Sequence, residues 1–158
     1  MEGPDVDDMT PTPSLTTTDR SLPIALLRAR ERLLIPIRRM LADAGVSEPQ
    51  WRILRVLSEA GPMSGQDLAR AACLQPASVS RLLQTMVEKD QIARVQDMAN
   101  RRRQVVSIRP AGSEILSRYG AVSRRITDDV ARRFGERNYE KLLDLLEELA
   151  ALDIGTTD

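Results

Sequence analysis

The sequence contains no histidine and only one cysteine, Cys73, among its 158 residues. A catalytic triad that needs histidine is therefore excluded. A lone cysteine forms no internal disulfide, and without histidine it makes no plausible zinc cluster. No glycine-rich phosphate loop is present, and the sequence singles out no pair of carboxylates. We therefore expect a protein that is not an enzyme and that uses no metal or cofactor.

Aromatic residues make up only 3% of the chain, although 42% of its residues are hydrophobic. The core must therefore be aliphatic, and the length suits one domain of ordinary size, with or without extra helices for assembly. No apolar run approaches the roughly 20 residues that span a bilayer, and the N-terminus lacks the basic-then-apolar order of a signal peptide. We expect a cytoplasmic protein with no membrane partner.

The formal net charge is zero, but the charges are distributed unevenly along the chain. Residues 1–20 carry five acidic side chains and one arginine, whereas residues 64–109 carry eight basic and four acidic side chains. The first segment is also rich in threonine and proline, so we expect a disordered acidic tail at 1–20. The positive surplus of the second segment lies where the phosphates of a nucleic acid would be met.

Residues 64–109 have the pattern of a short helix, a turn, a longer helix and two short strands. Ser64 is a good helix cap, and Pro76 suits the first position of the longer helix. Alternation in 92–97 and 105–109 predicts a β-hairpin. Apolar residues at helical spacing predict the buried faces of the two helices: Leu68, Ala69, Ala72 and Cys73 in the first, and Val79, Leu82, Leu83, Met86 and Val87 in the second.

The opposite face of the longer helix carries short polar side chains around Arg81, a surface that can enter a DNA major groove. Arg81 is the residue best able to make a bidentate contact to guanine. Three adjacent arginines at the hairpin tip form a cationic finger suited to phosphates or to a narrow minor groove. A solvated charge run is the alternative for the tip, but the attached helix-turn-helix pattern favours DNA binding. The predicted DNA-binding residues are Ser78, Ser80, Arg81, Gln84, Thr85, Arg101, Arg102 and Arg103.

Helical apolar patterns flank residues 47–109 on both sides. Residues 21–46 have more apolar surface than one neighbouring helix could cover, and Pro36 is expected to kink or divide that helix. Residues 110–154 contain a long helix and a last helix with a leucine seam. We therefore predict that 21–46 and 110–154 form a dimerisation region, and that the homodimer reads a short palindromic operator in double-stranded DNA.

Several short motifs are spread across residues 21–152: Gln50-Trp51-Arg52-Ile53-Leu54 with Leu57, Leu68-Ala69, Ser78-Val79-Ser80-Arg81-Leu82, the arginine tip and Pro110-Ala111-Gly112. In these motifs the sequence resembles a MarR-type winged-helix transcription regulator. Residues 21–31 resemble, more narrowly, the branch that regulates the breakdown of homoprotocatechuate and related aromatic acids. The resemblance implies a mainly α fold with a small β-wing: a winged helix-turn-helix DNA-binding domain at 47–109 plus N- and C-terminal dimerisation helices.

The resemblance also assigns a role within the arginine tip. Arg102 matches the wing arginine that enters the minor groove in the family. The residue before the tip pair is usually an aspartate that orients this arginine, whereas this sequence has Asn100. An amide still accepts a hydrogen bond but lacks the negative charge, so we predict a looser wing.

Arginines among apolar residues predict a cationic, partly apolar cleft between the first two helices. A guanidinium binds a carboxylate bidentately, so an aromatic carboxylate is the expected small-molecule effector. Trp51 reads as a core anchor, and the family resemblance also places it near the effector pocket. The open alternative is that the arginines reach solvent or pair with Glu31 and Glu59. The predicted effector-binding residues are Arg28, Arg30, Trp51 and Arg55, with Arg52 beside them.

The combined hypothesis is a dimeric repressor that an aromatic carboxylate releases from its operator. One alternative is an architectural DNA binder without an effector, and another is a dimeric interaction module with a degenerate wing. A further alternative is a regulator that senses oxidants through Cys73. The apolar neighbours of Cys73 instead predict a buried, inert thiol, and the chain has no second cysteine to resolve an oxidised one.

Overall fold

The computed structural model describes residues 17–101 and 103–155, and the chain divides into two compact units, Met1–Leu34 and Ile35–Asp158. Most of the predicted tail, residues 1–16, lies outside the described residues, as does Arg102 of the predicted DNA-binding set. At the end of this segment, Thr18–Arg20 form one turn of 3-10 helix with no buried residue.

Helix α1 spans Leu22–Ala44 and begins one residue after the predicted cap. Pro36 lies inside this helix without dividing it, because proline removes only one backbone donor from the ladder of hydrogen bonds. Of the two effects expected of Pro36, a kink or a division, the division does not occur. The helix ends at Gly45, whose φ of +68° favours glycine, and the N–H of Val46 donates to the carbonyl of Leu41 at 3.2 Å.

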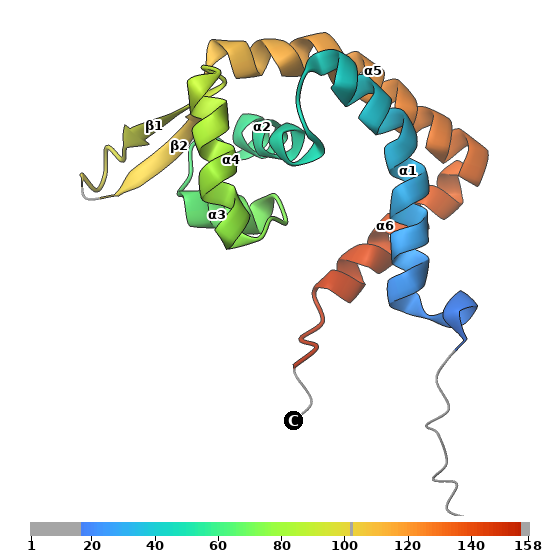
Figure 1. The fold of residues 1–158 in the computed structure, drawn as a ribbon. Coiled ribbons are helices and arrows are strands. Elements are labelled where there is room, and N and C mark those ends of the chain that lie inside the picture. The colour runs from blue at the N-terminus through green and yellow to red at the C-terminus, as the bar shows by residue number, and fades with distance from the viewer. Residues whose placement is uncertain (1–16, 102, 156–158) are drawn as a thin grey trace, which may run out of the picture. The chain divides into compact units, whose positions relative to one another are not determined.

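Three helices then form the centre of the second unit: α2 (Glu48–Ala60), α3 (Gly65–Ala71) and α4 (Pro76–Glu88). Ser47 and Gln50 cap α2 reciprocally. Ser64 caps α3 and Pro76 opens α4, which confirms the two predicted helix starts. In Figure 1 these helices and the strand pair gather at one end of α5. Their shared aliphatic core includes Ile53, Leu54, Leu68, Met86 and Ile92, all essentially inaccessible to solvent.

The predicted hairpin is an antiparallel pair of strands, β1 (Ile92–Gln96) and β2 (Gln104–Ile108). Its register runs from Ile92 opposite Ile108 to Gln96 opposite Gln104. Met63, in the segment that leads into α3, bridges to Val106 of β2, and the two N–H to carbonyl distances are 3.2 and 2.7 Å. The sequence pattern did not predict this bridge, which joins the hairpin to the start of the helix-turn-helix.

Helix α5 (Pro110–Phe134) and helix α6 (Glu136–Ala150) complete the chain. A second core cluster joins Met40, Leu41, Val46 and Trp51 to the apolar side of α5. The fold is thus mainly helical with a two-stranded wing, as predicted. No helix among the described residues has the length and apolar character needed to cross a membrane.

Candidate functional site

Helix α4 presents the predicted polar face to solvent because its apolar face is anchored in the core. Val79, Leu83 and Met86 are buried. Thr85 is only half-exposed, and its hydroxyl donates to the carbonyl of Arg81 at 3.2 Å. The amide of Gln84 donates to Glu88 at 3.1 Å. The exposed members of the predicted face are therefore Ser78, Ser80, Arg81 and Gln84.

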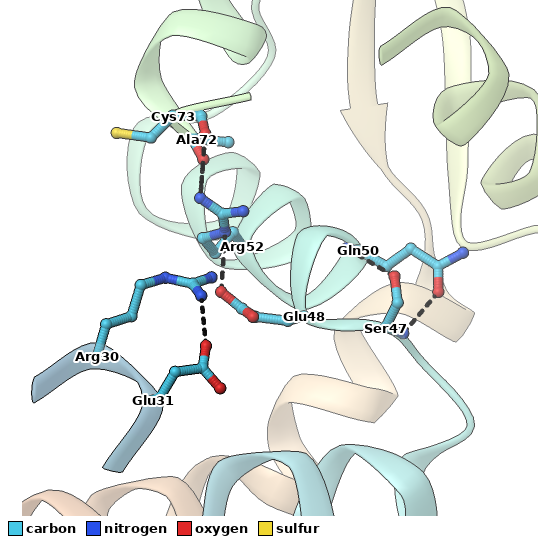
Figure 2. A network of polar contacts seen from close by, with 8 residues as sticks. All are labelled: Arg30, Glu31, Ser47, Glu48, Gln50, Arg52, Ala72 and Cys73. Carbon is cyan, nitrogen blue, oxygen red and sulfur yellow. Dashed lines mark hydrogen bonds and ion pairs between the residues drawn. The ribbon is translucent and has the colours of Figure 1, made fainter. Parts of the chain in front are cut away.

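An arginine from α2 holds the turn between α3 and α4. Nη1 of Arg52 donates to the carbonyls of Ala72 and Cys73 at 2.8 and 3.2 Å, and Nε lies 3.9 Å from Glu48, as Figure 2 shows. The last carbonyls of a helix have no partners within the helix and carry partial negative charge, so they attract a guanidinium. Arg52 therefore fixes the turn and does not join Trp51 in a cleft, which corrects the sequence-based expectation for this side chain.

Cys73 is exposed, contrary to the prediction of a buried thiol. Helix α3 ends at Ala71, and Cys73 has a left-handed backbone with φ of +51°. The helical spacing that placed it in the apolar stripe with Ala72 ends before this position, so only Ala72 is buried.

Backbone hydrogen bonds close the tip of the wing. The N–H of Asp97 donates to the carbonyl of Arg103 at 2.9 Å, and the N–H of Arg103 donates to the carbonyl of Asn100 at 2.8 Å. The side-chain amide of Gln96 donates to the carbonyl of Arg101 at 3.0 Å. These bonds define the path of the chain at Gln96, Asp97, Asn100, Arg101 and Arg103.

The two described tip arginines, Arg101 and Arg103, are both exposed. Nη2 of Arg103 also lies 2.8 Å from Oδ2 of Asp67 in α3. Ser64 donates to the same oxygen at 2.6 Å. This hydrogen bond is the largest of the effects that hold the pKa of Asp67 below its ordinary value. Desolvation, the next largest effect, raises the pKa, and the charges of Arg103 and Arg70 lower it further.

Sequence reasoning missed the ion pair between Arg103 and Asp67 because 36 positions separate the two residues. Asp67 gave one local signal, since it follows the cap Ser64 by three positions and so belongs to the first turn of a helix. That signal predicts a capping role. It does not predict the tertiary partner.

A cavity of about 450 Å³ lies between α2 and α5 and contains two of the predicted effector residues. Trp51 is 6% exposed and also belongs to the second core cluster, so its predicted role as a core anchor is confirmed. Arg55 pairs with Glu59 at 2.8 Å within α2, which is one of the pairings expected if it binds no ligand. The lining residues are Trp51, Arg55, Ser58, Glu59, Leu116, Gly120, Ser123, Arg124 and Thr127.

Arg124 is the charged residue of the cavity lining that sequence reasoning missed. It follows Leu116 and Gly120 at intervals of four, which places it beside the apolar stripe of α5. The other predicted effector residues, Arg28 and Arg30, belong to the first unit, where Arg28 pairs with Asp19 at 2.9 Å and Arg30 with Glu31 at 3.3 Å.

Comparison with known proteins agrees with this architecture. The sequence pattern of the MarR family matches residues 46–103. The HTH-type transcriptional regulator FarR of Neisseria gonorrhoeae is 30% identical over 133 residues, which cover 84% of this chain and 91% of FarR. The homoprotocatechuate degradative operon repressor of Escherichia coli is 30% identical over 132 residues, which cover 84% of this chain and 89% of the repressor.

A solved structure with the same fold is NadR in complex with 4-hydroxyphenylacetate. It is 29% identical, gives a TM-score of 0.78, and covers 90% of this chain and all of the NadR chain. These relatives are transcription regulators and not enzymes. The family resemblance read from the motifs is thus confirmed, and the chain belongs to the MarR family of winged-helix transcription regulators.

Proposed function

We propose that this protein is a dimeric repressor that binds double-stranded DNA through α4 and the wing. The observation that carries the proposal is the exposed polar face of α4, which surrounds Arg81 while the opposite face is buried. Arg81 would donate two hydrogen bonds to guanine in the major groove. The neighbouring residues Ser78, Ser80, Gln84 and Thr85 would divide base and phosphate contacts, and Arg101 and Arg102 would contact phosphates or the minor groove.

A second copy of the chain would cover the apolar surface that a monomer leaves exposed. In α6, Leu142, Leu143 and Leu145 are 40 to 50% exposed, and in α1 Leu22 and Leu27 are 53 and 60% exposed. Apolar surface of this extent in both terminal regions is typical of an assembly interface. A two-fold dimer presents two recognition helices, so the expected operator is a palindrome.

The cavity between α2 and α5 would hold a small aromatic carboxylate. Arg55 and Arg124 supply guanidinium groups for the carboxylate, and Trp51 and Leu116 supply apolar surface for the ring. Two relatives support this ligand class by name, since NadR was solved with 4-hydroxyphenylacetate and the E. coli relative represses homoprotocatechuate degradation.

Helix α2 offers a route from the cavity to the DNA-binding surface. It carries Trp51 and Arg55 in the cavity wall, and it carries Arg52 at the turn before α4. A ligand that binds better when α2 is displaced would therefore also favour a displaced turn. Only such a difference in affinity between two arrangements can release the DNA.

The test is a binding isotherm on the DNA upstream of the protein's own gene, at near-physiological salt, with and without 4-hydroxyphenylacetate and related acids. Selective binding that one acid weakens is the expected result. Arg81→Ala should lose at least tenfold in specific affinity, whereas Arg137→Ala, which removes an exposed arginine of α6, should change it little. Binding that depends on salt but not on sequence would instead favour the architectural DNA binder.

One observation favours a second trigger, because Cys73 is exposed on the turn that Arg52 holds. Oxidation there would place a larger polar group directly before α4. If Cys73 is the sensor, peroxide should release DNA from the wild type and not from Cys73→Ser. If the aromatic acid is the sole effector, both proteins should respond to peroxide equally or not at all.

A further inference from the structure

The wing is attached to the start of α3 at two levels. Nearer its base, the backbone of Val106 exchanges two hydrogen bonds with Met63. Three residues closer to the tip, or roughly 10 Å along an extended strand, the side chain of Arg103 reaches Asp67. The backbone of Arg103 also closes the tip turn through both its N–H and its carbonyl. Arg103 is therefore the residue at which the tip and α3 are joined.

Asp67 is already held in place to receive this guanidinium. Its backbone N–H donates to the hydroxyl of Ser64 at 3.1 Å, and its Oδ2 accepts from the same hydroxyl at 2.6 Å. It also lies in the first turn of α3, where the helix dipole favours a negative charge. A carboxylate fixed by its own helix loses little side-chain freedom when it binds a partner from the wing.

We propose that Arg103 and Asp67 are positioning residues that hold the wing tip on α3, so that Arg101 meets the DNA while Arg103 does not contact phosphate. The proposal rests on the proposed DNA-binding function and refines it. Asn100, at the tip, is a neutral amide, and α3 supplies the carboxylate that Arg103 meets. Arg103 thereby leaves the set of three DNA-contacting tip arginines that the sequence predicted.

The competing arrangement is that Arg103 leaves Asp67 to bind a phosphate when DNA is present. Arg103 and Asp67 are 50 and 43% exposed, so DNA could reach either side chain. The two arrangements predict opposite effects of Asp67→Asn. Removing the charge would weaken DNA binding if the pair positions the wing, but would strengthen it if Asp67 withholds Arg103 from a phosphate.

The experiment measures DNA affinity at several salt concentrations for the wild type, Asp67→Asn, Arg103→Gln and the double variant, with Arg101→Gln as the control. We expect each single change at the pair to weaken binding about twofold to fivefold, and the double variant to bind no more weakly than Arg103→Gln. The slope of log affinity against log salt should stay unchanged in these variants. Arg101→Gln should reduce that slope by about 0.9, as expected for one lost phosphate contact.

Tighter binding by Asp67→Asn, a slope reduced by about 0.9 in Arg103→Gln, or additive losses in the double variant would each overturn the proposal. Amide hydrogen exchange on the same proteins without DNA tests the positioning role of Arg103 and Asp67 independently of the proposed DNA-binding function. Residues 96–104 should exchange faster in Asp67→Asn, while α4 and α5 stay protected. If the wild type bound no DNA selectively, the DNA-binding function would fail, but the exchange data would still decide whether the pair holds the tip. Unchanged exchange at the tip would reject the pair itself.

Discussion

The two ends of α3 are held by arginines from other elements, but these arginines bind different kinds of acceptor. At the C-terminal end, Arg52 of α2 donates to the carbonyls of Ala72 and Cys73. At the N-terminal end, Arg103 of the wing meets the carboxylate of Asp67. Carbonyls do not titrate, whereas a half-exposed ion pair weakens with salt and in acid. The turn should therefore be the constant part of the DNA-binding unit, and the wing the adjustable part.

The largest expected effect concerns the start of α5, which lies against the segment before β1 and against α2, the helix that carries Arg52. A Cβ on Gly112, near the start of α5, would lie 2.3 Å from the carbonyl oxygen of Gln91 and 2.8 Å from Leu54. Gly112→Ala should lower the free energy of unfolding by about 2–3 kcal/mol, as measured by denaturant titration.

Gly120→Ala is the matched control on the same helix, since a Cβ there would meet no atom of the described residues within 4 Å. It should be neutral, or stabilising by up to about 1 kcal/mol, because alanine favours a helix interior. Equal effects of the two substitutions would mean that α5 moves to accept a larger residue at position 112. The packing of α5 against α2 would then not be rigid.

The next effect tests the turn. Arg52→Gln removes the charged donor from two carbonyls and should cost about 1–2 kcal/mol of stability. Arg55→Gln, three positions along α2, removes only an exposed pair with Glu59 and should cost less than about 0.5 kcal/mol. Denaturant titration of both variants decides the matter, and similar losses would show that Arg52 adds no more than a surface ion pair.

A smaller effect distinguishes the two ends by salt. Raising the ionic strength from 0.1 to 1 M shortens the screening length from about 10 to 3 Å. Amide exchange at the wing tip should then increase in the wild type but not in Asp67→Asn, which has already lost the pair. Exchange at residues 72–75 should change little in either protein. If salt increased amide exchange at residues 72–75 as much as at the wing tip, the two ends of α3 would not differ in their dependence on charge.

The smallest effect is that of pH. Because the pKa of Asp67 is lowered in the folded protein, its stabilising contribution is complete above the unfolded value and is lost as the pH falls through the folded value. The pair should therefore stay intact from pH 6 to 8, and the chain has no histidine to titrate in that range. Carboxyl NMR should detect a higher pKa for Asp67 in Ser64→Ala, since the hydroxyl of Ser64 is the main cause of the shift.

Local chemistry predicted the elements well, because caps and prolines act on their own helices. Ser64 and Pro76 each mark a helix start that the structure confirms. The last helix begins at Glu136, well before Leu142, the first leucine of its seam, since Gly135 with φ of +92° ends α5 and caps α6 directly. An apolar pattern marks where a helix packs and does not mark where its first turn forms.

Tertiary partners could not be predicted in the same way. Arg52 and Arg55 both lie close to Trp51 in the sequence, and the sequence pattern assigned both to the same cleft. In the structure, Arg52 holds the turn after α3, whereas Arg55 lines the cavity. The direction of each side chain depends on which elements pack on either side of α2. The exposure of Cys73 was missed for a related reason, because a left-handed residue after a helix interrupts the spacing from which burial was predicted.

The exposure of Cys73 has a practical use. The chain contains one cysteine and one tryptophan, and Trp51 adjoins Arg52, whose guanidinium bonds the carbonyl of Cys73. A thiol-reactive dye would therefore label the folded protein at a single site, within energy-transfer range of its own intrinsic donor. Fluorescence energy transfer could then report the distance between the turn that follows α3 and Trp51 in the cavity wall, without any engineered cysteine or tryptophan.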